Sequence, residues 1–275
     1  MVPAKDTSPA LPARPGGAAA ASPPAGQSRP VTEADALIFT GEMDGVQADQ
    51  LAALLGVPPR RASAVIARWR VGGLADAAIL GPGPRWVWLT RTGLARAGLP
   101  YSARAPGLSR LAHLRAVVAV RLALSAVPGY RESGAYWRSE RRLRRRMGGT
   151  LGLREHVPDG EVHWPDGACW PGGAPVPCAG ECWAIEAELT PKTLARTTAI
   201  MREVLARTGD YGCPAGQARV PGAAARHARV IYLCSPAARP VVLRARDALG
   251  PLAGRVEIRM LPPGAALPGQ ETAGP

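Results

Sequence analysis

Acidic side chains with the spacing of metal ligands occur in two short stretches near the middle of the chain. The first is His156–Trp164 and the second is Trp183–Lys192. Residues two apart on a strand lie on the same face, so if the two stretches pair as a hairpin, their carboxylates converge on one patch. Oxygen-rich patches of this kind bind Mg²⁺ or Mn²⁺. The side chains in question are Asp159, Glu161, His163, Glu186 and Glu188.

The second stretch alternates apolar and polar side chains, which is typical of a strand with one buried face. Glu186 and Glu188 would share one face, and the other would carry Trp183, Ile185, Ala187 and Leu189. The plainer interpretation is that the two glutamates form a solvated strand face.

A turn is the plainer interpretation of the first stretch. Pro158-Asp159-Gly160 is an ordinary turn signal, and Pro165-Asp166-Gly167 repeats it shortly afterwards. At least one copy is therefore expected only to turn the chain.

Composition favours a basic protein that binds a polyanion. The chain has 275 residues, enough for two ordinary domains, with 47% apolar residues and a net charge of +13. Its lysines are Lys5 and Lys192. We expect nucleic acid as the partner, and not a membrane, because no apolar run approaches the roughly 20 residues that span a bilayer. The N-terminus has no apolar signal region, so we expect a cytoplasmic protein.

The five cysteines, an odd number, argue against a disulfide framework. Four of them could form a zinc site, although their spacing matches no standard pattern. The alternative is that they are small buried or loop thiols. These four are Cys169, Cys178, Cys182 and Cys213.

The front half of the chain resembles a winged helix-turn-helix domain. Residues 1–30 are rich in Pro, Ala, Gly and Ser and predict a disordered tail. Within 31–100 we predict a helix capped by Thr32, a second helix near Gln47 and a third helix over 59–71 with Ala64, Val65, Ile66 and Trp69 buried. Two β segments and a short helix follow. The basic residues expected to contact DNA are Arg60, Arg61, Arg68, Arg70 and Arg85, unless they only form a solvated face.

The back half predicts an α/β domain with a mixed sheet over 108–262, after a linker at 101–107 and before a tail at 263–275. A helix begins at Ser109 and contains His113, which we interpret as structural. A basic segment follows, in which Arg141, Arg142 and Arg145 would neutralise DNA phosphates. After the hairpin we predict, in order, a helix over 191–208, a strand over 229–234, a helix over 237–249 and a strand over 255–261.

Four segments together resemble the replication-relaxation family, an actinobacterial group on plasmids and other mobile elements. They are Leu111-Ala112-His113-Leu114, Ser139-Glu140-Arg141, His156-Val157-Pro158-Asp159-Gly160 and the run Trp183–Lys192. An Asp after Pro, a strand with Glu-x-Glu and a crossover helix also look like the PD-(D/E)XK nuclease core. The resemblance covers roughly residues 32–262 and implies a winged-helix front half with a nuclease-like back half.

The resemblance implies a role for each acidic residue. Asp159 and Glu186 would hold Mg²⁺ or Mn²⁺, and Glu140 would be the outlying acid, unless it is only an ion-pair partner of the arginines around it. Glu188 takes the place where the commonest nuclease pattern has lysine, and Lys192 could supply the missing positive charge. The implied reaction is metal-dependent hydrolysis of a DNA phosphodiester.

Three functions stay open at this point. The first is a metal-dependent endonuclease or nickase that acts on double-stranded DNA in the replication or transfer of a mobile element. The second is a non-catalytic DNA-binding protein with a decayed nuclease site, as the Glu188 departure would allow. The third is a module that recruits replication or transfer proteins. The chain could also act as a homodimer.

Overall fold

The computed structural model describes residues 30–127, 130, 134–146, 156–164, 181–208 and 225–267. It is a mixed α/β structure with a three-stranded antiparallel sheet and a five-stranded mixed sheet. Within these residues no helix is both long and apolar enough to cross a membrane.

The first unit is a helical cluster around the small sheet, whose strand order is β1-β3-β2. Thr32 caps the first helix, as predicted, because its side chain accepts a hydrogen bond from the Asp35 amide. Gly56, at a φ of 63°, makes the turn between the second and third helices. The elements are α1 (Glu33–Glu42), β1 (Val46–Gln47), α2 (Ala48–Leu55), α3 (Pro59–Val71), β2 (Ala75–Ala78), β3 (Trp86–Leu89) and α4 (Arg91–Arg96).

Two details of this unit differ from the prediction. Ala64 of α3 is exposed, and the helix buries Ala62 together with Val65, Ile66 and Trp69. The buried stripe therefore begins earlier in the helix than expected. The strand β1 was not anticipated, because a two-residue strand carries no alternation that a sequence pattern could reveal.

The second unit is the five-stranded sheet with its helices. Its strand order is β4-β5-β6-β7-β8, antiparallel from β4 to β6 and parallel from β6 to β8. The predicted hairpin and crossover helix are confirmed. The elements are η1 (Leu108–Arg110), α5 (Leu111–Ser125), β4 (Tyr136–Ser139), α6 (Glu140–Arg146), β5 (Gly160–Trp164), β6 (Glu181–Glu188), α7 (Leu194–Ala206), β7 (Arg229–Cys234), α8 (Arg239–Asp247), η2 (Gly250–Arg255) and β8 (Val256–Met260).

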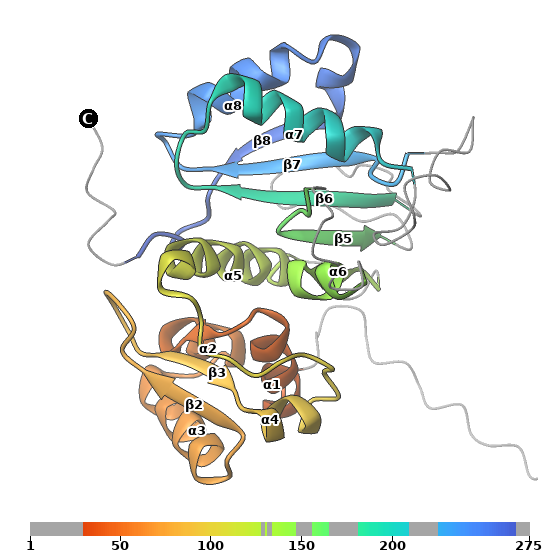
Figure 1. Cartoon of the computed structure of the whole chain (residues 1–275). Helices are drawn as coiled ribbons and strands as arrows, with labels where there is room; N and C mark the ends of the chain where they lie inside the picture. The colour runs from red at the N-terminus through yellow and green to blue at the C-terminus, as the bar shows by residue number, and fades with distance from the viewer. Residues whose placement is uncertain are drawn as a thin grey trace, which may run out of the picture.

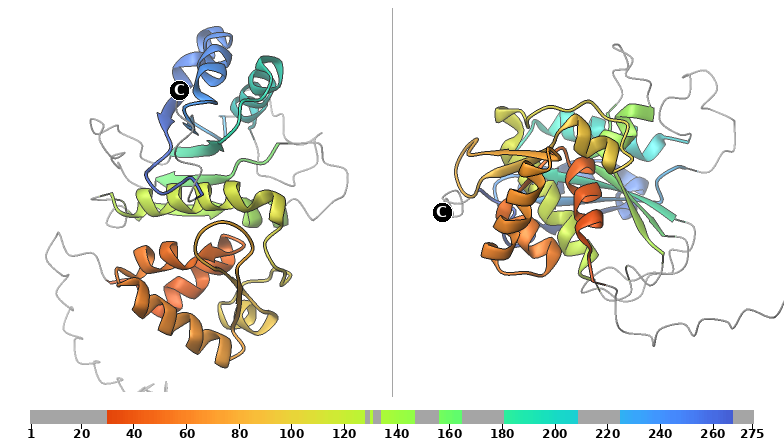
Figure 2. Two further views of the ribbon diagram at one scale, coloured as in Figure 1. Left: turned by 90° about the vertical axis from the view of Figure 1, so that its left-hand side faces the viewer. Right: turned by 90° about the horizontal axis from the view of Figure 1, so that it is seen from below.

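The layers are stacked in a simple order. Helix α5 lies between the large sheet and the first unit, and α7 and α8 cover the other face of that sheet (Figures 1 and 2). The basic segment contains both a strand, β4, and the short helix α6, so it continues the sheet as well as carrying arginines.

Strand β6 has the predicted two faces, but both are covered. Trp183, Ile185 and Ala187 pack with α5 in one apolar cluster, whereas Ala184 packs with α7 in another. Glu186 and Glu188 lie on the α7 side and are buried. The solvated-face interpretation of these glutamates is therefore wrong.

Candidate active site

Asp159 lies immediately before β5, where its carboxylate is fixed on both sides. Its Oδ2 accepts a hydrogen bond from the Ala187 amide of β6 at 2.8 Å, and its Oδ1 lies 2.7 Å from His113 Nε2 of α5. Burial would raise the pKa of Asp159, but the charge and hydrogen bond of His113, the Ala187 amide and the charge of His156 together hold it below its ordinary value. The same contact raises the pKa of His113 against the opposing effect of burial. His113 therefore contacts the candidate site directly, while its interpretation as a structural residue stays untested.

Gly160 explains why glycine follows Asp159. A Cβ at this position would come within 2.0 Å of the Trp137 ring on β4, so any other residue would force the ring or the strands to shift. The Pro-Asp-Gly segment thus has a packing role as well as a chemical one.

Glu186 sits on the neighbouring strand and is paired with a second histidine. His156 Nε2 lies 2.6 Å from Glu186 Oε1. Burial, together with the charge of Asp159, raises the pKa of Glu186 to about 7 despite this contact. Burial would lower the pKa of His156, but the hydrogen bond with Glu186 raises it above its ordinary value. A buried carboxylate that is hard to ionise beside another carboxylate is typical of a functional site.

Glu188 and Lys192 form the next pair along the chain. Lys192 Nζ contacts Glu188 Oε2, so the lysine does reach back from the start of the crossover segment to β6. A cation therefore stands close to the third carboxylate of the cluster.

Tyr232 lies beside the three carboxylates Asp159, Glu186 and Glu188, which form the acidic cluster. No sequence pattern selects this tyrosine. It lies beside Glu186 in the parallel register of β6 and β7. Its side chain is 1% exposed, and its hydroxyl has no hydrogen-bond partner among the described residues. Burial, and then the charges of Glu186, Glu188 and Asp159, hold the pKa of Tyr232 well above its ordinary value. A buried hydroxyl without a partner is uncommon and points to a missing ligand or water.

Glu140 is an ion-pair partner in this structure. Its Oε2 accepts from Arg110 at 2.5 Å and its Oε1 accepts from Arg144 at 2.7 Å. Its backbone amide bonds the Asp159 carbonyl at 3.2 Å, which places it next to the site. Both carboxylate oxygens are thus engaged, so a role as an outlying metal ligand would require the arginines to move.

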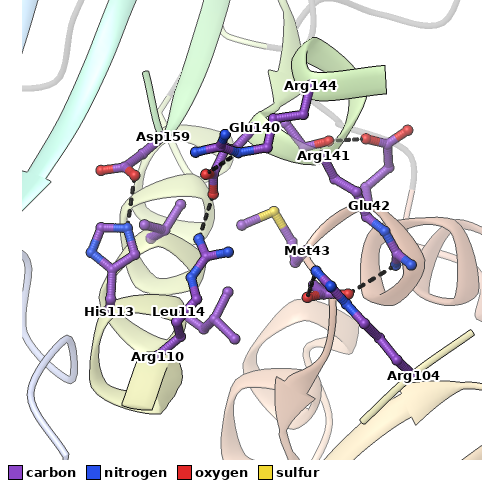
Figure 3. A pocket seen from close by; sticks show the side chains of 13 residues that line it. Glu42, Met43, Arg104, Arg110, His113, Leu114, Glu140, Arg141, Arg144 and Asp159 are labelled. Atoms are coloured by element: carbon purple, nitrogen blue, oxygen red, sulfur yellow. Dashed lines mark hydrogen bonds and ion pairs between the residues drawn. The ribbon is translucent and has the colours of Figure 1, made fainter. Parts of the chain in front are cut away.

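A pocket of about 160 Å³ opens between the first unit and α5 and α6 (Figure 3). Asp159 and His113 stand at one end of it, and Arg104 stands at the other. We call it the junction pocket; its polar lining is Glu42, Asp44, Arg104, Arg110, His113, Ser139, Glu140, Arg141, Arg144 and Asp159.

A second cluster of possible metal ligands lies along β5 and β6. Donor atoms of Glu161, His163 and Cys182 lie within 4.8 Å of one another, so this buried group could hold a metal ion. Within the described residues it is the one such group found, and Asp159, Glu186 and Glu188 do not form another.

The contacts of Glu161 weaken the metal interpretation of this second cluster. Arg226 donates to both carboxylate oxygens at 2.7 Å, and His227 Nε2 lies 2.8 Å from Oε1. His163 contacts Glu161 and Cys182 through the same ring nitrogen, which rules out a relay between them in this arrangement. Of the predicted zinc set, Cys169, Cys178 and Cys213 lie outside the described residues.

The arginines of the first unit are exposed, as expected for phosphate contacts. Arg70 of α3 and Arg85 before β3 line one pocket, so these two arginines lie on the same side of the first unit. Arg68 differs from the rest because it forms an ion pair with Glu33 of α1. The exposed set is Arg60, Arg61, Arg68, Arg70 and Arg85.

The arginines of α6 do not share one role. Arg141 donates to the Gly41 carbonyl at 2.8 Å, pairs with Asp44 and stacks over Tyr101, so it fastens α6 to the first unit. Arg145 is exposed but donates to the Pro100 carbonyl. Arg142 is exposed on α6.

Comparisons with family models, with curated proteins and with solved structures find no significant match to this chain. The interpretation of the site therefore depends on its own geometry. His113, Tyr232 and Arg110 are the residues near Asp159 that sequence patterns did not select. For His113 the signal was available: it is one of few polar residues on a mostly apolar helix, inside a segment that carries the family resemblance.

Proposed function

We propose that this protein binds double-stranded DNA and hydrolyses a phosphodiester bond with Mg²⁺ or Mn²⁺ held by Asp159 and Glu186. The proposal is carried by the burial of three carboxylates, Asp159, Glu186 and Glu188, near the hydroxyl of Tyr232. This hydroxyl has no hydrogen-bond partner among the described residues. The charge of Asp159 helps to raise the pKa of the buried Glu186, and a cation between the two would remove this repulsion.

The chemistry of the donors suits a hard divalent cation. Mg²⁺ and Mn²⁺ prefer carboxylate oxygens, which Asp159 and Glu186 supply from neighbouring strands. The hydrogen bond from Ala187 would hold Asp159 in place, while the contacts of Asp159 with His113 and of Glu186 with His156 would open when the ion binds.

A bound divalent cation would supply Lewis acidity, activating water and stabilising negative charge on the phosphate. The chain's own residues have complementary roles. Lys192 would bring a positive charge beside the phosphate, since its contact with Glu188 keeps it at the site. The histidines would release protons when they leave the carboxylates, because Asp159 and Glu186 are what raise their pKa values.

Binding to DNA is proposed for the first unit, interpreted as a winged helix. Helix α3 would enter the major groove, and the β2–β3 turn would act as the wing. Support comes from the exposed arginines on α3 and from Arg70 and Arg85 lining one pocket. We interpret the second unit as a PD-(D/E)XK-like domain, since Asp159 precedes one strand, Glu186 lies on the next and α7 crosses over to a parallel strand. Replication or transfer of a mobile element is the role that the replication-relaxation resemblance suggests.

A second candidate function is DNA binding without cleavage. It is favoured by the present contacts of the carboxylates: histidines hold Asp159 and Glu186, and Lys192 holds Glu188. If these contacts persist in the presence of metal, the site is a retired nuclease centre.

Cleavage of supercoiled plasmid separates the two candidates. The protein is incubated with plasmid in Mg²⁺, Mn²⁺ or EDTA, beside Glu186→Gln and the control Glu257→Gln, whose carboxylate pairs with Arg259 on β8. We expect nicked circles with metal for the wild type and the control, and none for Glu186→Gln or in EDTA. Binding of DNA by all three proteins with no nicking in either metal would favour the second candidate.

A further inference from the structure

In the junction pocket, three of the arginine side chains lie nearer the solvent than the carboxylates do. The side chains of Arg104, Arg110 and Arg144 are 66%, 40% and 58% exposed, so they stand at its mouth. Those of Asp44, Glu140 and Asp159 are 12%, 17% and 11% exposed and lie deeper. A molecule that approaches from solvent therefore meets positive charge first.

Two carboxylates are shared among four arginines in this pocket. Glu140 pairs with Arg110 and Arg144. Asp44 pairs with Arg104 and Arg141. The other two acids of the lining have neutral or histidine partners: Asp159 contacts His113, and Glu42 accepts hydrogen bonds from Tyr101 at 3.0 Å and from Ser139. The four arginines and four acids balance over the whole lining, but Arg110 and Arg144 share the single carboxylate of Glu140, which leaves a positive excess at this pair.

The arginines at the mouth also keep unused donors. A guanidinium group has several N–H donors in a planar fork. Arg104, Arg110 and Arg144 each make a single side-chain hydrogen bond within the described part of the chain. Arg141, in contrast, is committed to carbonyl oxygens of the first unit. The remaining donors at the mouth suit the bidentate recognition of a phosphate.

The size of the pocket limits what can enter. A cavity of roughly 150 Å³ holds a molecule of about the size of benzene, and the junction pocket measures about 160 Å³. It has room for a phosphate group and its first sugar atoms, but not for a whole nucleotide.

We infer that the junction pocket binds one phosphate group of a nucleic-acid strand, held by Arg110 and Arg144 beside Asp159. The inference rests on the proposed function, because it is the strand's passage over Asp159 that brings a phosphate to this pocket. Glu140 then holds the two arginines apart and oriented until the phosphate arrives.

The test measures binding in the absence of hydrolysis. A fluorescent single-stranded oligonucleotide and its duplex are titrated in EDTA against full-length protein carrying Glu186→Gln, alone or with Arg110→Gln plus Arg144→Gln. The control adds Arg244→Gln, an exposed arginine of α8 on the far side of the sheet. We expect the double arginine change to weaken binding about tenfold and to lower the salt slope by about one, as for one lost phosphate contact. The control should change neither.

Two results would overturn the inference. One is equal affinity and salt slope for the double arginine variant and the control. The other concerns inorganic phosphate. If phosphate raises the melting temperature only when Arg110 and Arg144 are present, and oligonucleotide binding does not depend on them, the pocket binds a small free phosphate compound. Because loss of the Glu140 pairs could unfold α6, Arg110→Lys and Arg144→Lys serve as second variants. They keep the charge but lose the fork, and intermediate affinity is expected.

Failure of the proposed function looks different. If plasmid is never cut but the arginine changes weaken oligonucleotide binding as expected, the proposed phosphate site is supported and the proposed hydrolysis is contradicted. If plasmid is cut as well by protein with Arg110→Gln plus Arg144→Gln and an intact Glu186 as by the wild type, the proposed hydrolysis is supported and the proposed phosphate site is contradicted.

Discussion

Tyr232 and Glu186 are direct neighbours in the parallel register of β7 and β6, and the buried hydroxyl of Tyr232 has no partner among the described residues. Glu188 and Asp159 act on the same hydroxyl electrostatically, because their charges also raise the pKa of Tyr232. In the proposed function, Tyr232 therefore marks the place where a cation or an ordered water would complete the acidic cluster.

Replacement of Tyr232 by Phe removes this hydroxyl and leaves the ring in the core. Without metal we expect the free energy of unfolding to stay equal or to rise by about 1 kcal/mol, because an unsatisfied buried group is lost. With Mn²⁺ present, the variant should gain less thermal stability than the wild type. Melting temperatures with and without Mn²⁺ check both points. A metal-dependent gain equal to that of the wild type would separate Tyr232 from the site.

Glu161 should make stability depend on pH. Burial alone would raise its pKa, but hydrogen bonds from His163, His227 and Arg226 hold this pKa well below its ordinary value of 4.5. A depressed pKa stabilises the fold above the unfolded-state value and loses this contribution as the pH falls.

Glu161→Gln should cost about 3–5 kcal/mol at neutral pH, because Arg226 loses its buried partner. The difference from the wild type should shrink below about pH 4.5. Urea unfolding between pH 3 and pH 7 measures it, with Glu257→Gln as the control. A difference that stays constant over this range would contradict the assignment.

Arg141 and Arg142 are neighbours with different expected roles. Arg141→Ala should lower the free energy of unfolding by about 1–3 kcal/mol, since its hydrogen bonds fasten α6 to the first unit. Arg142→Ala should change it by less than about 0.5 kcal/mol, because this side chain is not buried in the junction between the units. Chemical denaturation of both variants provides the comparison. Equal losses would show that Arg141 does not hold the two units together.

The exposed arginines of α3 and the β2–β3 turn should set the salt dependence of DNA binding. Arg70→Ala and Arg85→Ala are each expected to lower the slope of log K against log salt by about one. Arg68→Ala should have a smaller effect, because Arg68 is already paired with Glu33. Fluorescence anisotropy at several salt concentrations tests this, with Arg244→Ala as the control. Slopes that are unchanged in all variants would exclude this surface.

The hairpin and the strands after it could be predicted from the sequence because their signals are local. Alternation in β6 and the apolar run of β7 are visible without knowledge of neighbours, and both strands form as expected. The burial of Glu186 and Glu188 could not be predicted in this way. It depends on α7 folding back over that face, which is a tertiary event.

The partners of the acids were harder to predict for the same reason. His113 reaches Asp159 from another element, far away in the sequence, and Tyr232 meets Glu186 only through the parallel register. Strand β4 lies in a segment whose many arginines obscured its alternation. Lys192, in contrast, is close to Glu188 in the sequence, and its position was anticipated.

Direct measurement of Mn²⁺ binding is the sharpest test of the acidic cluster. Calorimetric titration or the loss of the free Mn²⁺ signal in electron paramagnetic resonance is applied to the wild type, Asp159→Asn, Glu186→Gln and the control Glu257→Gln. We predict that the wild type and the control bind Mn²⁺ equally and that both site variants lose at least about tenfold in affinity. Equal binding by Glu186→Gln and the wild type, or no binding by any of them, would contradict the account.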